Sequence, residues 1–294
     1  MKPSMKPLMK TAWRAHIGDV AVPTILLAFA VFSGTFAVWA AALSDALPLW
    51  AAGAIQTVLA YLAFTPVHEA VHGNIGGSAK RGWIDEAVGW ACGMLLIAPY
   101  PAFKTLHLRH HSNTNDPEND PDYWVAGGNP LSVVLRCLTI LPHYHLWVLG
   151  QRGGQSPALR RVRRVAGVGL VVLIAVMAAF TAAGFGAEVL ALWVVPALLA
   201  TGLLAFAFDW APHHPHDSRG RFVDTRVILA PGLTLLMVGQ NYHLIHHLWP
   251  RVPFYRYGVL FREIRAELEA KGSPILELGT ARRPTAPSGT ARAR

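Results

Sequence analysis

Charged residues are missing from four long stretches of the sequence. Neither Asp, Glu, Lys nor Arg occurs in the runs 20–44, 46–67, 165–187 and 189–208. A helix needs about 20 apolar residues to cross the hydrocarbon core of a bilayer, and each run is about that long. The runs leave no polar face for water, which argues against buried hairpins of a soluble protein. We therefore predict four transmembrane helices.

The residues between these runs predict how the helices are connected and oriented. Single acidic residues, Asp45 and Glu188, separate the runs of each pair, so the helices should form two hairpins. All 26 Lys and Arg residues lie outside the runs, in 2–14, 80–164 and 219–294. Positive residues mark the cytoplasmic side of a membrane. We expect the termini and the long central connection in the cytoplasm and both hairpin tips outside.

Three further apolar stretches are shorter or interrupted by polar residues and prolines: 87–103, 131–150 and 227–242. They are typical of interfacial or re-entrant helices, which here would cover a cytosolic cap. The predicted fold class is therefore all-α, a polytopic membrane protein with four transmembrane helices below a helical cap. The tail 281–294 is rich in Pro, Ala, Thr, Ser, Gly and Arg, so we expect disorder after a single membrane domain, 1–280.

The composition agrees with a membrane protein. Hydrophobic residues make up 53% of the chain and charged residues only 15%, whereas soluble domains carry about 25% charged residues. The two cysteines, Cys92 and Cys137, are too few for a disulfide scaffold, an iron–sulfur cluster or a four-cysteine zinc site. The net charge of +9 follows the predicted topology and suits anionic lipid head groups. Nucleic acid is not an expected partner, because no binding motif accompanies the charge.

Most of the 14 histidines gather in four short motifs, HEAVH, HLRHH, PHHPH and HLIHH. They hold His68 and His72; His107, His110 and His111; His213, His214 and His216; and His243, His246 and His247. Spacings of three and four place side chains on one face of a helix. The other three histidines, His16, His143 and His145, are expected to be ordinary polar residues.

The positions of these motifs predict a metal centre. The first motif follows the second apolar run directly, and PHHPH follows the fourth, so both lie at the predicted cytoplasmic ends of helices. Eight or nine buried imidazoles at one place would repel one another if protonated and lack partners if neutral. Two bound metal ions would resolve both problems. Imidazole binds Fe, Zn, Cu or Ni, so iron with O2 as co-substrate is a hypothesis at this point.

The three boxes resemble the signature of the membrane fatty acid desaturase and hydroxylase superfamily: H-x(3–4)-H, then H-x(2–3)-H-H twice. All three occur here in order, with a hydrophobic hairpin between the second and the third, over most of residues 20–265. The resemblance implies four transmembrane helices beneath a cytosolic cap that holds two irons. It also implies eight iron ligands: His68, His72, His107, His110, His111, His243, His246 and His247.

Known desaturases of this kind place one more histidine at the cytosolic end of the fourth helix, one turn after a polar residue. Asp209 precedes His213 by four residues, so His213 is our choice for this ligand. The neighbouring prolines disturb the helix, which leaves His214 and His216 as alternatives. Asp209 stands where those desaturases have Asn, a departure from the family pattern.

The segments HHSNTNDPENDPD and NYHLIHHLWPRVPFYRY look most like bacterial carotenoid ring hydroxylases and bacterial desaturase-like proteins. The acidic residues of the first segment form either a solvated loop or partners that orient the ligand N–H groups. These residues are Asp116, Glu118, Asp120 and Asp122.

The resemblance implies removal of hydrogen from an unactivated C–H bond, giving either a double bond or an alcohol. The substrate should be a long apolar lipid, a fatty acyl chain or a carotenoid, because the site opens from the bilayer. Four aromatic residues fit an interfacial belt or, alternatively, the substrate path: Trp210, Trp249, Phe254 and Tyr255. The sequence has no dinucleotide fingerprint and no Cys set for a cluster, so we expect an external ferredoxin-like electron donor. The expected location is the bacterial inner membrane.

Two other functions fit parts of the sequence. HEAVH matches the H-E-x-x-H motif of zinc proteases, in which Glu69 would be the general base. An intramembrane protease would leave the two later boxes unexplained. A non-catalytic metal transporter would place its site near the bilayer midplane, whereas these histidines lie at helix ends.

Overall fold

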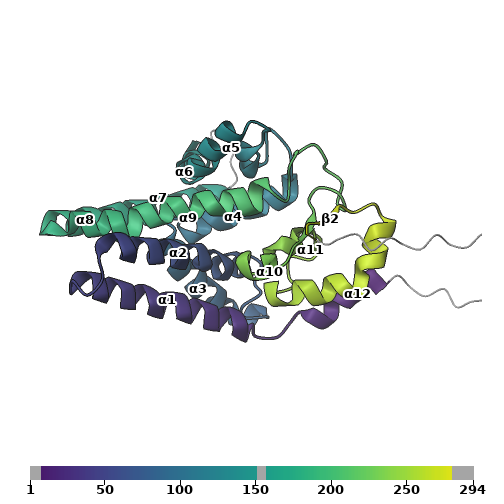
Figure 1. The fold of residues 1–294 in the computed structure, drawn as a ribbon, viewed down its shortest axis with the longest axis horizontal. Helices are drawn as coiled ribbons and strands as arrows, with labels where there is room; N and C mark the ends of the chain where they lie inside the picture. Colours follow the sequence, from purple (N-terminus) through teal and green to yellow (C-terminus); the bar gives the residue numbers. More distant parts are fainter. Residues whose placement is uncertain (1–7, 151–156, 280–294) are drawn as a thin grey trace, which may run out of the picture.

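The computed structural model describes residues 8–150 and 157–279, and most of these residues are helical (Figure 1). By length and composition, three helices could cross a membrane: Val22–Leu43, Leu49–Val71 and Pro157–Trp210. A fourth is possible if the bent pair Pro130–Leu138 and Ile140–Gly150, which meet at 62°, forms one span. The predicted apolar runs therefore do form long helices.

The first two long helices, α1 (Val22–Leu43) and α2 (Leu49–Val71), form a hairpin. The third helical stretch consists of α7 (Pro157–Phe180), α8 (Gly186–Val189) and α9 (Val195–Leu204), joined by the π-helical turns η5 (Thr181–Phe185) and η6 (Leu190–Val194) and ending in η7 (Ala205–Trp210). Figure 1 shows the long helices running along the same axis, with α8 at one end of the molecule.

The third stretch doubles back on itself at Gly184. That residue has φ 99°, a left-handed value that glycine adopts readily and that interrupts the helix. On one side of the break Gly169 lies against Trp90 of α3 (Gly82–Leu95), and on the other Trp193 Nε1 donates to Met94 O of the same helix at 2.9 Å. Gly169 and Trp193 would lie about 36 Å apart in a straight helix. Both can contact α3 only because the chain reverses between them.

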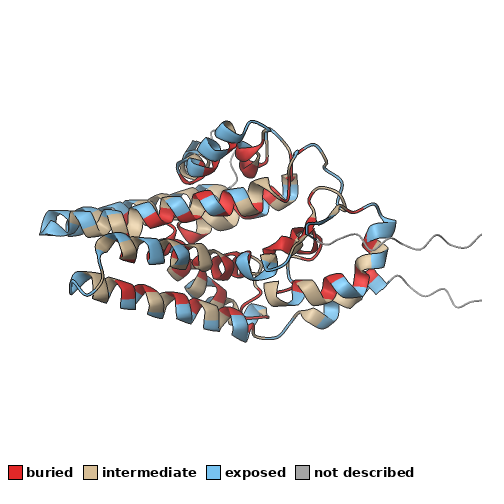
Figure 2. Ribbon diagram, viewed as in Figure 1, coloured by how far each residue is buried: buried red, intermediate tan, exposed pale blue. Residues whose placement is uncertain are grey.

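The outward faces of the long helices are largely exposed (Figure 2), and many of the exposed residues are large and apolar. Phe29 is 70% exposed, Trp50 79% and Val171 66%. Exposed apolar surface on this scale marks a contact with lipid or protein rather than with water. The core lies on the inner faces, where α2 packs against α1, α3 and α9.

The remaining helices are shorter. They are α4 (Tyr100–Asn113), α5 (Pro130–Leu138), α6 (Ile140–Gly150), α10 (Leu233–Leu236), α11 (His243–Leu248) and α12 (Tyr257–Ala270). Short 3-10 turns are η1 (Leu8–Lys10), η2 (Ala12–His16), η3 (Ala79–Arg81), η4 (Pro121–Val125), η8 (Gln240–Tyr242) and η9 (Phe254–Arg256).

The structure corrects the sequence analysis in one element. The prediction of a helix from the start of 227–242 is wrong, because Val227–Leu229 forms strand β1 and pairs in parallel with β2 (Ile275–Glu277). The fold is therefore mostly, but not entirely, helical. The tail 281–294, predicted to be disordered, lies outside the described residues.

Candidate metal centre

Four elements far apart in the sequence carry the histidine motifs to one place. His68 lies in the last turn of α2 and His72 caps that helix. α4 carries the second box, α11 carries the third, and His213 lies in the turn after η7. All nine histidines proposed as ligands lie in this one cluster, where their rings contact one another.

One group of four imidazoles comes from all three boxes. Its members are His68, His72, His107 and His246, and their ligand nitrogens all lie within 4.8 Å of one another. The Nε2 atoms of His68 and His246 are 3.0 Å apart, and those of His72 and His107 are 2.9 Å apart. Four nitrogens at such spacing could hold one metal ion.

A second group of four lies beside the first. It contains His110, His213, His243 and His247, again within 4.8 Å of one another. His247 Nε2 is 3.2 Å from Nε2 of both His110 and His243. His111 lies between the groups, with its Nε2 2.8 Å from that of His246 and its ring 4.4 Å from that of His247. The arrangement therefore offers two adjacent metal positions.

The remaining histidines of the described residues belong to neither group. His214 packs against Trp210 at 4.8 Å between ring centroids, and His216 Nε2 lies 3.3 Å from the backbone oxygen of Asp209. Of the three residues in PHHPH, the geometry thus brings only His213 to the cluster. His16, His143 and His145 lie elsewhere and contact Glu263, Trp124 and Ile97 respectively.

The outer nitrogens of several imidazoles are held by hydrogen bonds. His110 Nδ1 lies 2.9 Å from Asp120 Oδ1, and His213 Nδ1 lies 3.2 Å from the backbone oxygen of Asp224. Carboxylates and carbonyls only accept, so each Nδ1 carries the hydrogen and leaves a lone pair on Nε2 when the ring is neutral. The buried Nε2 of His213 has no hydrogen-bond partner among the described residues. Lone pairs directed inward are what a metal site requires.

Burial keeps most of these rings neutral. Loss of solvation lowers the pKa of His72 and of His243 to about 3, so both can offer a lone pair near pH 7. His110 differs: burial also lowers its pKa, but the carboxylates of Asp120 and Asp122 outweigh this effect and raise the pKa to about 10. A metal ion would have to displace that proton.

The acidic residues that follow the second box make two different kinds of contact. Asp120 and Asp122 are buried against the Nδ1 side of His110, at 2.9 and 3.3 Å, so they support this ring from outside the cluster. Asp116 instead forms an ion pair with Arg219 at 3.0 Å, and Glu118 lies at the surface. Both alternatives left open by the sequence are therefore present, in different residues.

Asp209 is held by a tyrosine rather than by the histidine that follows it. Tyr144 Oη donates to Asp122 Oδ1 at 2.6 Å and lies 3.3 Å from Asp209 Oδ2. Tyr144 therefore connects Asp209, at the end of the long helical stretch, with Asp122, which contacts His110. Sequence reasoning missed Tyr144, as well as Tyr257, whose hydroxyl lies 3.0 Å from His246 Nδ1.

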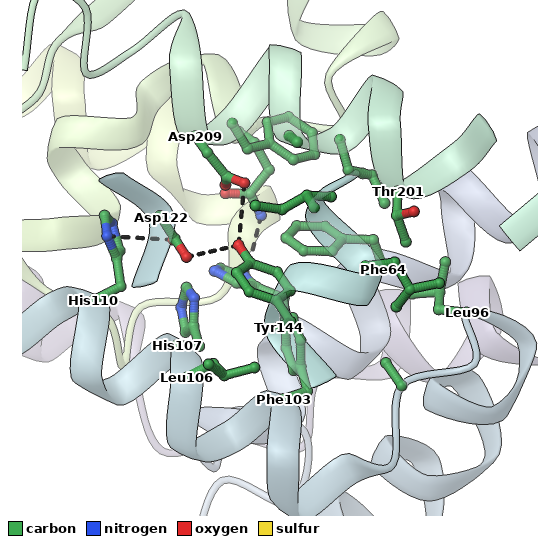
Figure 3. A pocket seen from close by; sticks show the side chains of 18 of the residues that line it. Phe64, Leu96, Phe103, Leu106, His107, His110, Asp122, Tyr144, Thr201 and Asp209 are labelled. Carbon is green, nitrogen blue, oxygen red and sulfur yellow. Dashed lines mark hydrogen bonds and ion pairs between the residues drawn. The ribbon is translucent and has the colours of Figure 1, made fainter. Parts of the chain in front are cut away.

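A narrow cavity extends from the cluster between α2, α4, α6 and α9 (Figure 3). His68, His107, His110 and His243 line it at the end nearest the histidine cluster. Its other walls are mainly apolar and include Phe64, Leu96, Phe103, Leu106, Ile140, Leu141, Leu204 and Phe208. Figure 3 shows Thr201 and Leu96 at the opposite end from His110. The cavity could hold an apolar chain with one segment beside the histidine cluster.

The four aromatic residues considered for the substrate path do not line this cavity. Trp249 is buried in a separate core around α12, and Trp210 Nε1 donates to Gly127 O at 3.0 Å. Glu69, the base of the protease hypothesis, does not line the cavity either. Its carboxyl group is fully buried, so it is poorly placed to activate water at the cluster.

Comparison with known proteins identifies the family of this chain. Residues 44–279 match the model of the fatty acid desaturase family, which covers most of the chain. The chain therefore belongs to the fatty acid desaturase family, and the resemblance stated from its sequence is confirmed.

Curated relatives are plant enzymes. An sn-2 acyl-lipid omega-3 desaturase (ferredoxin), chloroplastic, from Helianthus annuus is 23% identical over 84% of this chain and 60% of its own length. A Delta(12) acyl-lipid conjugase (11E,13E-forming) from Impatiens balsamina is 26% identical over 59% of this chain and 55% of its own length. A bifunctional fatty acid conjugase/Delta(12)-oleate desaturase from Punica granatum is 48% identical, but over only 42 residues, 14% of this chain and 11% of its own length. The chain thus spans at most 60% of the length of these relatives.

Proposed function

We propose that this protein is an O2-dependent di-iron desaturase of long acyl chains. The observation that carries the proposal is the pair of four-imidazole groups, joined by His111, at the end of an apolar cavity. The nine ligands would be His68, His72, His107, His110, His111, His213, His243, His246 and His247. A bound iron pair would supply the O2 chemistry that removes hydrogen from an unactivated C–H bond.

The surrounding residues would position and isolate this chemistry. Asp120, the backbone of Asp224 and Tyr257 hold three imidazoles from their outer side, which fixes the orientation of each ring. The aromatic walls formed by Phe64 and Phe103 would exclude water and hold the chain in one orientation. Such positioning decides which carbon is attacked and whether a double bond or an alcohol forms.

Desaturation of an acyl lipid is favoured over hydroxylation of a carotenoid. The names of the relatives describe an acyl-lipid desaturase and an acyl-lipid conjugase. Electrons would come from an external ferredoxin-like protein. The name of the Helianthus annuus relative includes ferredoxin, and the basic charge of this chain would attract an acidic partner.

In this proposal the two hairpins cross the membrane four times, and the histidine cluster lies just inside the cytoplasmic surface. The tips near Asp45 and Glu188 would lie outside, and all Lys and Arg residues on the cytoplasmic side. The proposed location is a bacterial inner membrane, with both termini in the cytoplasm.

Lipid analysis of expressing cells tests the reaction. The protein should be produced in a host that contains saturated and unsaturated lipids and β-carotene, beside a His107→Ala variant as the control. We expect new lipids two hydrogens lighter than host lipids only with the unaltered protein. A gain of one oxygen on β-carotene would instead indicate a ring hydroxylase, and unchanged lipids would contradict both reactions.

A further inference from the structure

A second cavity, with a volume of about 750 Å³, lies among the shorter segments. It is lined by residues of η1 and η2, the loop before β1, the end of α11 and the last turns of α12, and by none of α1, α2, α7, α8 or α9. η1 and η2 pack against α12, which Figure 1 shows at the opposite end of the molecule from α8. In the proposed orientation the cavity therefore lies on the cytoplasmic side.

Four cations give this cavity a strong positive charge. Lys10, Arg14, Arg221 and Lys271 all line it, are exposed, and form no ion pair with a described residue. Among the described residues that line the cavity, Glu267 is the single acid, and both of its carboxylate oxygens accept from the backbone N–H of Met9 at 3.2 Å. Four cations and one carboxylate leave a formal charge of +3, which favours an acidic partner.

Aromatic rings lie beside these cations in the same cavity. The guanidinium of Arg14 lies 5.6 Å from the ring centre of Trp13, and the ammonium of Lys271 lies 4.7 Å from that of Phe222. Trp13 and Phe222 are half-buried and line the cavity. Protein–protein interfaces are enriched in aromatic residues and arginine, so this lining suits a folded protein better than a layer of small anions.

One wall of the cavity leads to the histidine cluster through buried side chains. Trp249, which is 8% exposed, lines the cavity and lies two residues after His247, so their Cα atoms are at most about 7 Å apart. Trp249 belongs to the same buried core as Tyr257, whose hydroxyl lies 3.0 Å from His246 Nδ1. A redox centre bound in the cavity would therefore be separated from the cluster by closely packed side chains.

We propose that this basic cavity is the docking site of the electron donor, a small acidic ferredoxin-like protein. The inference rests on the proposed desaturation. Reduction of O2 to two waters takes four electrons and four protons, and the acyl chain supplies two of each when it loses two hydrogens. Two reduced donor molecules, each oxidised by one electron, supply the other two electrons, and solvent supplies the other two protons.

Binding of a plant-type [2Fe–2S] ferredoxin to the full-length protein in nanodiscs tests the site without turnover. Arg221→Glu and Lys271→Glu each remove one attraction and add one repulsion. We expect each to raise the Kd about fivefold at physiological ionic strength. The difference should shrink in about 1 M salt, because screening weakens interactions between exposed charges. Failure of the unaltered protein to bind ferredoxin would overturn the inference.

Arg262→Glu is the matched control, because it changes the net charge by the same amount and lies on the same helix as Glu267. It precedes Lys271 by nine residues and lines a different cavity. The separation along the axis is about 13 Å, more than the Debye length of about 8 Å at physiological salt. Its Kd should stay close to that of the parent; equal weakening by all three substitutions would indicate attraction by net charge alone and overturn the assignment.

Carbodiimide cross-linking locates the bound donor. The reagent joins a lysine amine to a carboxylate that it contacts directly. We expect ferredoxin to become linked to Lys10 and Lys271, and not to Lys80, which is exposed but does not line the cavity. Links formed mainly through Lys80 would place the donor elsewhere and overturn the inference.

Turnover separates the docking site from the proposed reaction. Protein that is reduced with dithionite and then given O2 needs no donor, so all variants should form equal amounts of unsaturated product in a single turnover. With limiting ferredoxin, Arg221→Glu and Lys271→Glu should react about fivefold more slowly than Arg262→Glu; equal rates would overturn the docking site. No product from the chemically reduced protein would contradict the desaturation itself, while the binding and cross-linking results would still decide where the donor docks.

Discussion

Each imidazole of the cluster has two nitrogens with different tasks. The Nε2 atoms face one another at 2.8–3.2 Å, while outer nitrogens contact Asp120, Tyr257 and the backbone of Asp224. Because these outer contacts fix the ring orientation, residues that never touch a metal should affect how tightly it is held.

Tyr257 offers a direct test of this effect. Tyr257→Phe removes the hydroxyl 3.0 Å from His246 Nδ1 but keeps the fully buried ring. We expect iron affinity to fall about 10- to 100-fold while the fold is retained. Iron titration of the apoprotein measures the change. Tyr242→Phe is the control, because that hydroxyl makes no hydrogen bond among the described residues; equal losses in both variants would contradict the role of Tyr257.

The PHHPH motif allows a comparison between adjacent residues. His213→Ala removes a member of the second group of four, and we expect iron content to fall from about two to about one per chain. His214→Ala removes a ring that packs on Trp210 outside the groups and should leave the iron content unchanged. Metal analysis of both purified variants decides the assignment, which would be reversed if only His214→Ala lost iron.

The histidines could be found from sequence because regular spacing places them on one helix face. Their supporting residues could not. Tyr144 and Tyr257 are single residues without a motif, and each meets the cluster only through tertiary packing. Asp122 and Glu118 look alike in the sequence, yet only the first turns toward His110. Side-chain partners of this kind depend on the path of the backbone, which spacing does not specify.

A helix could be predicted where the residues of that segment alone indicate it. A long uncharged run marks an apolar helix, and Gly184 lies at the break between two such helices. Strand β1 has only three residues, and its partner β2 lies 48 positions later in the chain. Its apolar residues resemble those of a buried helix, so the strand could be recognised only once its partner was known.

Close packing of α2 against η6 depends on a glycine. A Cβ at Gly53 would lie 2.7 Å from the backbone oxygen of Ala191, which cannot move without shifting the helix. Gly53→Ala should therefore lower the free energy of unfolding by about 1–3 kcal/mol, as overpacking does. Thermal unfolding in detergent measures this.

Gly167→Ala is the matched control for that substitution. The nearest atom to a Cβ at Gly167 is Leu149 Cδ2 at 4.0 Å, so the variant should be as stable as the parent or up to about 1 kcal/mol more stable. A Gly53→Ala protein that unfolds no earlier than Gly167→Ala would show that the helices are not in close contact there.

At the scale of the whole molecule, the hairpin turns and the histidine cluster lie at opposite ends of the long helices (Figure 1). Single cysteines placed at Ala46 and Ala187 should react with a membrane-impermeant thiol reagent outside intact cells, and one at Lys271 should not. The natural Cys92 and Cys137 are buried, which keeps background labelling low. Labelling at Lys271 from outside would contradict the proposed orientation.

Segments as distant in the sequence as α2 and α11 meet at one histidine cluster, and the proposed reaction depends on this arrangement. Its most direct test is the metal content of the full-length protein purified without chelator and reconstituted with ferrous iron. We expect about two irons per chain, bound by nitrogen ligands in X-ray absorption spectra, and loss of both after mutation of His107 and His247 together. A single zinc ion per chain, or iron that survives that double substitution, would contradict a di-iron centre.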